Sequence, residues 1–241
     1  MTEKKIPQHV AIIMDGNRRW ARAQGLEIIK GHRKVAEEMI ERLTEYAEDQ
    51  GISYLTLWAF STENWQRDEN EVSALMDLFR ESFSKSSEKL HKRGIRINVL
   101  GNLQRFPQDI QAGMQDWLEK TRQNDRMTVS FALNYGGRDE ILRATKQLLL
   151  DSNSQNWDIQ KISSLTENDF SKKLDTARGI SLPDPELLIR TGGEQRLSGF
   201  LPWQMTYTEL YFTPTLMPDF DEKEFQKALD EFSKRQRRFG K

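Results

Sequence analysis

Short apolar runs alternate with longer amphipathic segments along most of this sequence, and no other feature limits the possible folds as strongly. The runs HVAIIM (residues 9–14), YLTLWAF (54–60), IRINVLG (95–101) and MTVSFALNY (127–135) are typical of buried strands. The segments between them space their apolar residues as a helix does. Strands that alternate with helices predict an α/β fold with a mainly parallel central sheet flanked by helices.

Capping residues locate the ends of several helices. The segment KVAEEMIERLTEYAEDQ (34–50) is followed by Gly51, and EVSALMDLFRESFSKSSEKLHKR (71–93) is followed by Gly94, so both are predicted to be long helices. Further helices are expected near residues 107–123, from Arg138 onward, at the capping-box-like Thr166-Glu-Asn-Asp169 and over residues 221–239. Further strands are expected in PELLIR (185–190) and ELYF (209–212).

Composition and charge narrow the functional classes. With 241 residues, 37% hydrophobic content and no linker-like stretch, the chain predicts a single domain over residues 1–241. The formal net charge of −1 argues against a nucleic-acid partner, because binding a polyanion needs an excess of positive charge. The absence of cysteine excludes disulfides and thiolate chemistry, and three scattered histidines disfavour zinc but leave an oxygen-liganded metal open.

The N-terminus and the hydropathy pattern bear on location. The first residues, MTEKKIPQHV, are too short and too polar for a signal peptide, and no apolar stretch approaches the length needed to span a bilayer. We therefore expect a cytoplasmic protein. Such a protein can still handle a lipid by enclosing its chain in a tunnel and working at the membrane surface.

Polar loops that carry arginine or glycine follow four of the expected strands: residues 15–20 (DGNRRW), 61–67 (STENWQR), 134–138 (NYGGR) and 190–198 (RTGGEQRLS). In an open parallel sheet, the loops at the carboxyl ends of the strands converge on the ligand site. Any one of these loops is equally consistent with an ordinary turn. Together they bring guanidinium groups, which match phosphate oxygens, to one edge and so indicate a phosphate-bearing ligand: Arg18, Arg19, Arg67, Arg190 and Arg196.

The local motifs indicate which kind of phosphate is bound. There is no Gly-x-x-x-x-Gly-Lys-Ser/Thr loop and no Gly-x-Gly-x-x-Gly turn, so nucleotides are disfavoured. Asp15-Gly16-Asn17 instead suggests a diphosphate cradle, in which backbone N–H groups at the start of the next helix face the diphosphate and Asp15 holds a divalent cation against it.

Eight segments in order along nearly the whole chain match the motifs of one family: HVAIIMDGN (9–17), GHRK (31–34), AFSTENWQR (59–67), EVSALM (71–76), ALNYGGR (132–138), LLIRTGGEQRLSGFLPWQ (187–204), YTELYF (207–212) and RRFG (237–240). On these segments the chain resembles the cis-prenyltransferases, the (Z)-polyprenyl diphosphate synthase family, and most of all the bacterial undecaprenyl diphosphate synthases. The ordered set is more diagnostic than any single motif.

The resemblance implies a (Z)-prenyl synthase-like fold with a hydrophobic tunnel and a Mg2+-dependent prenyltransferase activity. In such an enzyme an allylic diphosphate, usually farnesyl diphosphate, is elongated by repeated cis-condensation of isopentenyl diphosphate. The implied product is undecaprenyl diphosphate, the precursor of the lipid carrier for cell-wall glycans such as peptidoglycan. The resemblance further implies a homodimer with peripheral membrane contact for product release.

Roles for individual residues follow from the same resemblance. Asp15 matches the catalytic, metal-associated aspartate, Asn64 the proposed proton acceptor and Glu209 the second acidic residue at the metal. Arg190, Arg196 and Ser198 match the anchors of isopentenyl diphosphate, and His32 is assigned to diphosphate contact or proton handling. The full set of implied substrate contacts is Gly16, Asn17, Arg18, Arg19, Trp20, His32, Ser61, Thr62, Glu63, Trp65, Arg67, Arg190, Arg196, Leu197 and Ser198. The ending Arg238-Phe-Gly240 resembles a motif that can reach a partner subunit's site.

The sequence departs from the family pattern at two positions. Ile28 and Val35 stand where the family usually carries arginine and glycine. One lost charge-assisted contact with a diphosphate costs on the order of 1.5 to 3 kcal/mol if nothing replaces it, and Lys30 is a candidate replacement. Val35 is expected to narrow the tunnel, whose wall could also include Met76, Leu78, Phe79 and Phe83, although core packing explains those four equally well.

Three alternatives to an undecaprenyl diphosphate synthase stay open. The nearest is a shorter-chain cis-prenyl diphosphate synthase. A non-catalytic partner subunit that retains only the fold is disfavoured, because it would not need an intact metal and diphosphate site. The most distant is a generic phosphoester-binding α/β protein, which tight binding of nucleotides in preference to prenyl diphosphates would favour. Taken alone, Trp65 and Trp203 are more typical of a core than of a site.

Overall fold

A six-stranded parallel sheet in the order β3-β4-β2-β1-β5-β6 forms the centre of the computed structural model. The structure describes residues 5–235, apart from the side chains of residues 82–84. The strands are β1 (His9–Ile13), β2 (Tyr54–Ser61), β3 (Ile95–Leu100), β4 (Met127–Tyr135), β5 (Leu187–Arg190) and β6 (Glu209–Phe212). All pairings are parallel, so the predicted α/β fold with a parallel sheet flanked by helices is confirmed.

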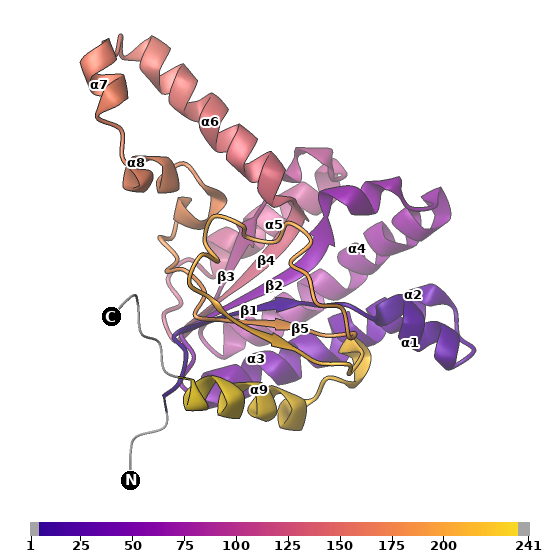
Figure 1. Cartoon of the computed structure of the whole chain (residues 1–241). Coiled ribbons are helices and arrows are strands. Elements are labelled where there is room, and N and C mark those ends of the chain that lie inside the picture. The colour runs from indigo at the N-terminus through magenta and orange to yellow at the C-terminus, as the bar shows by residue number, and fades with distance from the viewer. Residues whose placement is uncertain (1–4, 236–241) are drawn as a thin grey trace.

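Helices follow the strands much as the apolar spacing predicts (Figure 1). The α-helices are α1 (Asn17–Ala23), α2 (Ile28–Lys34), α3 (Ile40–Asp49), α4 (Glu69–Lys92), α5 (Gln108–Lys120), α6 (Gly137–Ser154), α7 (Ile159–Ser163), α8 (Glu167–Ser171) and α9 (Glu222–Lys234). The shorter 3-10 helices are η2 (Thr62–Gln66), η3 (Leu103–Arg105), η4 (Asp175–Ala177) and η5 (Met217–Asp219). Among the helices of residues 5–235, none has the combination of length and apolar character that crossing a membrane requires.

The helix expected over residues 34–50 begins earlier and is not uniform. It starts as α2 at Ile28, and the π-helical segment η1 (Val35–Met39) joins α2 to α3. Single π-helical turns inside an α-helix occur frequently at functional sites. The irregularity begins at Val35, one of the two positions that depart from the family pattern.

The two faces of the sheet are covered differently. Apolar side chains of α3, α4, α5 and α9 pack against alternate strand residues such as Val10 and Ile12. The opposite face, with Ala11 and Ile13, is covered by a segment of little regular structure: Leu182, Phe200, Leu201 and Met205. The sequence does not reveal this cover, because a coil has no apolar period to recognise. In Figure 1 it is the orange chain that crosses in front of the sheet, while α6 projects away from the body.

His9, at the amino end of β1, is fully buried and hydrogen-bonded on both sides of its ring. Its Nδ1 donates to the Pro183 carbonyl oxygen at 2.6 Å, and the Thr56 hydroxyl donates to its Nε2 at 2.8 Å. Burial lowers the pKa of His9 from 6.5 to about 4. Folding therefore keeps this imidazole neutral over a pH range in which it is protonated in the unfolded chain.

The free energy of unfolding should fall as the pH is lowered from 6.5 to 4, because the unfolded chain then binds a proton that the folded chain excludes. His9 alone accounts for about 3 kcal/mol of this loss. Urea denaturation at several pH values measures it. His9→Gln should reduce the pH dependence but not abolish it, because burial also lowers the pKa of His32 to about 4. Thr56→Val should lower the free energy of unfolding at every pH and leave the slope unchanged. An equal slope in His9→Gln and the unchanged protein would contradict this account.

Candidate functional site

Asp15 and Arg190 lie side by side at the carboxyl ends of β1 and β5. These neighbouring strands pair Ile13 with Arg190, and the chain then turns so that the Asp15 carboxylate meets the Arg190 Nη2 at 2.9 Å. Arg19, one helical turn on, approaches the same carboxylate at 3.1 Å. The Asp15 backbone is held as well, since its N–H donates to the Thr191 hydroxyl at 2.9 Å. Asp15 is therefore fixed between two cations in the position predicted for the catalytic aspartate.

Two glycines let the chain approach itself closely around Asp15. Gly16 has φ 110°, and a Cβ atom there would lie 2.8 Å from the Leu216 side chain. A Cβ on Gly31 would lie 2.2 Å from the Asn17 carbonyl oxygen, so α1 and α2 can meet only because this residue is glycine. The contact places His32 beside Asn17, whose Nδ2 lies 3.3 Å from the His32 Nδ1.

The Asn17 and His32 side chains each keep a buried polar atom without a hydrogen-bond partner within residues 5–235, namely the Asn17 Oδ1 and the His32 Nε2. Burial, together with the positive charges of Arg67 and Arg18, lowers the pKa of His32 from 6.5 to about 4. His32 is thus neutral at physiological pH. Buried polar atoms without partners are uncommon and are expected where a ligand completes the hydrogen bonding.

An arginine-lined pocket of about 270 Å³ opens beside these residues. Asp15, Gly16, Asn17 and His32 border it, and its positive charge comes from Arg18, Arg19, Arg22 and Arg67. Glu71 on α4 holds two of these groups, Arg67 at 2.9 Å and Arg18 at 3.5 Å. The sequence predicts convergence of guanidinium groups at this edge, and the geometry places these four around one pocket.

A second pocket, of about 240 Å³, lies between the ends of β1, β2 and β5. Asp15, Arg67 and Arg190 line it together with Ser61, Asn64 and Ser198. Ser61 and Asn64 form a capping box, in which the Ser61 N–H donates to the Asn64 Oδ1 at 3.0 Å. The Ser198 hydroxyl accepts from the Arg190 Nη1 at 2.9 Å. The two pockets, which contain residues predicted to bind two different substrates, share Asp15 and Arg67 in their linings.

An apolar cavity of about 80 Å³ adjoins both pockets, because Met14, Asn17 and His32 line all three. It lies where the sequence predicts a tunnel and runs between η1 and α4. Val35, Leu78 and Phe79 line it, whereas Met76 is a buried core residue outside the lining. Phe83 lies outside the described side chains.

Several predicted contact residues lie away from these cavities. Trp20 donates to the Asp219 carboxylate at 2.9 Å on the other side of α1, and the Lys34 ammonium lies 4.6 Å from its ring centre. Trp65 packs against Phe60 and Phe106, as the core interpretation of this residue predicts. The other residues that do not line the cavities are Thr62, Glu63, Arg196, which pairs with Glu194, and Leu197, which packs on the second core cluster. Arg238–Gly240 lie outside the described residues.

Glu209 is not brought to Asp15. It begins β6 and pairs with Leu187, which in turn pairs with Val10, so it lies at the amino end of the sheet. At 3.3 Å per strand residue, it is set back from Asp15 by roughly 16 Å along the strands. Its carboxylate pairs with Arg235 at 2.9 Å. Within one chain the two acidic residues predicted at the metal do not form a common site, because a parallel strand carries its first residue to the edge opposite the loops.

Asp15 is therefore the candidate metal ligand of this pocket. No cluster of three or more histidine, aspartate or glutamate side chains suited to a metal occurs within residues 5–235. Mg2+ does not need one, since it is commonly held by one or two carboxylates, substrate phosphates and water. The buried Asn17 Oδ1 without a partner is a further hard oxygen next to Asp15. These residues fit Mg2+ provided that a phosphate ligand completes its shell.

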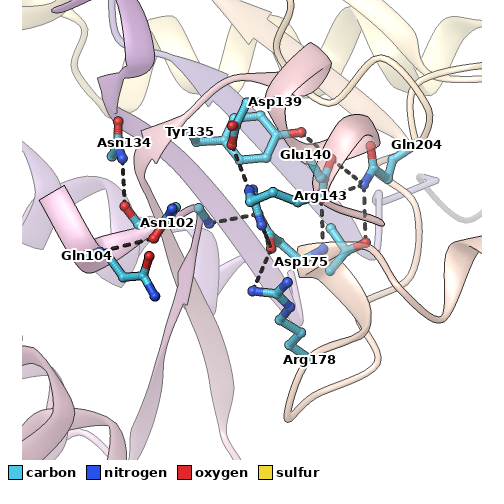
Figure 2. A network of polar contacts seen from close by, with 12 residues as sticks. Asn102, Gln104, Asn134, Tyr135, Asp139, Glu140, Arg143, Asp175, Arg178 and Gln204 are labelled. Carbon is cyan, nitrogen blue, oxygen red and sulfur yellow. Dashed lines mark hydrogen bonds and ion pairs between the residues drawn. The ribbon is translucent and has the colours of Figure 1, made fainter. Parts of the chain in front are cut away.

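A buried polar network lies around Glu140, between the end of β4 and the residues Asp175 and Gln204 (Figure 2). Glu140, at the start of α6, accepts hydrogen bonds from the Tyr135 hydroxyl at 2.6 Å, the Asp175 N–H at 2.8 Å and the Gln204 amide at 3.2 Å. Arg143 holds Asp175 through two bonds of 2.8 and 2.6 Å. The network ties the end of β4 to the coil that covers the second face of the sheet.

Some residues of the site were not predicted. Met14 borders all three cavities, and Thr191 is a fully buried clamp on the Asp15 backbone. Arg22 carried a usable signal, because it follows Arg18 at the i, i+4 spacing of one helix face. No local pattern marks Met14 or Thr191, whose roles depend on pairing between distant strands.

Fold and site together define a parallel α/β protein that can hold a phosphate-bearing ligand beside an apolar cavity. The sequence model of one family, described as "Putative undecaprenyl diphosphate synthase", matches residues 13–240. An isoprenyl transferase of Aquifex pyrophilus is 47% identical over 98% of this chain and 97% of its own length, and one of Thermotoga maritima is 46% identical over the same shares. The chain belongs to the cis-prenyltransferase family of isoprenyl transferases.

Two solved structures agree with this assignment. Lavandulyl diphosphate synthase from Lavandula x intermedia, solved in complex with dimethylallyl diphosphate, superposes with a TM-score of 0.92 at 33% identity, covering 98% of this chain and 99% of that one. A probable undecaprenyl diphosphate synthase from Campylobacter jejuni gives a TM-score of 0.78, also at 33% identity, covering 98% and 100%.

The Glu140 network yields a prediction on stability. Glu140→Leu should lower the free energy of unfolding by about 3 kcal/mol or more, because Tyr135, Gln204 and the Asp175 N–H lose a buried acceptor. Asp139→Asn is the matched control: Asp139 bonds Arg143 from a half-exposed position, so its loss should cost about 1 kcal/mol or less. Chemical denaturation measures both, and equal losses would refute the special role of Glu140.

Proposed function

We propose that this chain is a Mg2+-dependent cis-prenyltransferase that adds isopentenyl diphosphate repeatedly to an allylic diphosphate, with farnesyl diphosphate as the primer and undecaprenyl diphosphate as the product. One observation carries the proposal: Asp15, held between Arg19 and Arg190, borders an arginine-lined pocket that meets an apolar cavity at Met14, Asn17 and His32. An amphipathic substrate with a diphosphate head and a prenyl chain needs both environments. Residues 1–241 act in this proposal as one catalytic domain.

The two diphosphates are assigned to the two pockets. The pocket of Gly16, Asn17, Arg18 and Arg19 takes the allylic diphosphate, because these residues match the stretch that holds it in the family and the pocket adjoins the apolar cavity that receives the prenyl chain. The pocket of Arg190 and the predicted anchors Arg196 and Ser198 takes isopentenyl diphosphate. Arg196 is exposed and paired with Glu194, so it must turn inward to reach that ligand.

Bringing the two substrates together in one orientation is the main task of these residues. A bond forms between the terminal methylene carbon of isopentenyl diphosphate and the first carbon of the allylic chain, whose bond to the diphosphate oxygen breaks. The diphosphate leaves with the bonding electrons, and one proton is then lost from the isopentenyl unit. Asn64, fixed by its capping box in the wall between the pockets, is the candidate to receive that proton.

Asp15 would hold Mg2+ against the allylic diphosphate, and bound Mg2+ would neutralise charge that develops on the leaving group. The arginines contribute in the same direction, because fixed cations around a departing anion need no reorganisation during the reaction. Neutral His32, next to Asn17, is placed to contact the diphosphate with its buried Nε2.

A shorter-chain product is the second candidate, and a specific observation favours it. The apolar cavity has a volume of only about 80 Å³, and Val35 occupies part of its wall where the family usually has glycine. The choice is made by incubating the protein with Mg2+, farnesyl diphosphate and labelled isopentenyl diphosphate and separating the products by length. A ladder that ends near undecaprenyl supports the first candidate, and a short product supports the second. No incorporation with any primer would favour a non-catalytic partner subunit.

Asp15→Ala should lower kcat by about 10² to 10³, because the carboxylate acts on the transition state and is not part of the core. Rapid-quench measurement of the first condensation gives this rate directly. The thermal midpoint of the variant should fall, because buried Arg190 loses its carboxylate partner, so the rate is measured well below that midpoint, where circular dichroism shows the variant folded. Turnover at the original rate would remove Asp15 from the mechanism.

The protein is further proposed to act as a homodimer in the cytoplasm, with peripheral contact to the membrane that accepts its lipid product. Support for the dimer comes from the projecting arm of α6 and α7 (Figure 1). Exposed apolar side chains gather on this arm: Leu142, Leu149, Leu150, Ile159 and Ile162. The three leucines share one face of α6, since they are spaced by seven and eight residues. A second copy of the chain would remove this stripe from water.

Changing Leu149 and Leu150 together to Glu should convert a dimer to a monomer, because each leucine is more than 60% exposed in the single chain. Analytical ultracentrifugation across a concentration series measures the change. Leu26→Glu, which alters an exposed leucine outside the arm, should leave the dimer intact. A dimer in the double variant would show that the arm is not the interface.

A further inference from the structure

The arginines around the proposed allylic diphosphate pocket are not equivalent: Arg18, Arg19, Arg22 and Arg67. Arg19 is paired with Asp15 at 3.1 Å, and Glu71 holds both Arg67 and Arg18. Arg22 forms no ion pair with any carboxylate in the described part of the chain. Its guanidinium is therefore the charge of this pocket that a ligand can engage without displacing a protein partner.

Arg22 reaches the pocket because of its position on α1. Side chains four residues apart on a helix lie one above the other, so Arg22 follows Arg18 on the same face. The carbonyl of Ala21 accepts the Leu26 N–H at 2.9 Å, which closes the turn directly after this position. The pocket is thus bordered by arginine over the whole length of α1, from Arg18 to its last turn.

The neighbouring start of α2 offers no such charge. Ile28 is its first residue, and it does not line the arginine pocket. Lys30, the replacement suggested by sequence, is exposed and also absent from the pocket lining. Of the cationic residues between positions 20 and 31, the pocket lining includes Arg22 alone.

We propose that Arg22 binds the diphosphate of the allylic substrate in this chain and takes over the contact that Ile28 cannot make. The inference rests on the proposed function and adds a binding residue to it. Arg22 is a substrate-binding residue here, and it has no role in the chemical step.

The charge balance of the pocket agrees with this role. Asp15 and Glu71 compensate two of the four guanidinium groups, and His32 adds no charge because burial lowers its pKa to about 4. An excess of positive charge remains for a diphosphate, whose oxygens a planar guanidinium can engage in pairs.

The test is calorimetric titration of the full-length protein with farnesyl thiodiphosphate, a poorly reactive allylic analogue, and separately with inorganic diphosphate, both in Mg2+ buffer. R22Q should raise the Kd of both probes by about tenfold, the usual effect of one lost charge-assisted contact. R22K should fall between R22Q and the unchanged protein, because lysine restores the charge but not the fork. K30Q is the matched control and should change the Kd by less than about twofold.

Two further readouts separate binding from a structural effect. The KM for isopentenyl diphosphate should be unchanged in R22Q, and the Kd for farnesyl thiodiphosphate should depend less steeply on salt than in the unchanged protein. An unaltered Kd in R22Q overturns the proposal, as does a loss of affinity confined to K30Q. If the unchanged protein binds neither probe and elongates no primer, the proposed function fails as well. If the unchanged protein binds both probes and R22Q binds them with the same Kd, only the role of Arg22 fails.

Discussion

A buried guanidinium must be paired, and the site is organised around the place where Arg190 is buried. Arg190 is only 4% exposed, and removing such a charge from water costs several kcal/mol unless partners replace the solvent. Asp15 and Ser198 supply those partners, at 2.9 Å each. Asp15 can do so because β1 and β5 pair in a register that sets Ile13 against Arg190. The strand register and the site geometry are therefore one constraint: a slip by one residue would move Arg190 to the other face of the sheet and leave Asp15 without its partner.

The same logic extends to the neighbouring arginines. Glu71 lies on α4, yet it holds Arg67 from the loop after β2 and Arg18 from α1, so one carboxylate orients two guanidinium groups from different elements. Orientation before binding reduces the entropy that a ligand has to overcome, although a ligand must then compete with the carboxylate for each paired arginine. The paired arginines are ordered before a ligand binds, whereas Arg22 and the His32 Nε2 are free to contact a ligand without losing a protein partner within residues 5–235.

Much of this arrangement can be predicted from the sequence, because strand and helix periods are local and the loops after parallel strands must meet at one edge. The edge position of Asp15, Arg67 and Arg190 follows from that rule. The metal role of Glu209 rests on motif matching alone. The apolar run that Glu209 begins predicts a strand, and the first residue of a parallel strand lies far from the loops at the carboxyl ends of the strands in the same chain. The coil over Ala11 and Ile13 could not be predicted, since Phe200 and Leu201 pack there through turns in which Ser198 and Leu201 both take positive φ values. The choice between core and site for Trp65 likewise depends on Phe60 and Phe106, which a linear pattern does not bring together.

Met14, Asn17 and His32 form the boundary between the charged pockets and the apolar cavity, and this boundary explains the protonation state of His32. A charged imidazole would face Arg18 and Arg67 on one side and a low-dielectric cavity on the other, and both lower its pKa. The neutral ring can touch an apolar chain and a phosphate oxygen without the desolvation cost that a cation would incur. The apolar lining of the cavity also lowers the local dielectric constant on one side of the arginine pocket, which strengthens each ion contact made there. A ligand with a charged head and an apolar tail gains from both effects only when its head-to-tail junction lies at His32, so the boundary itself sets where along such a molecule the protein positions it.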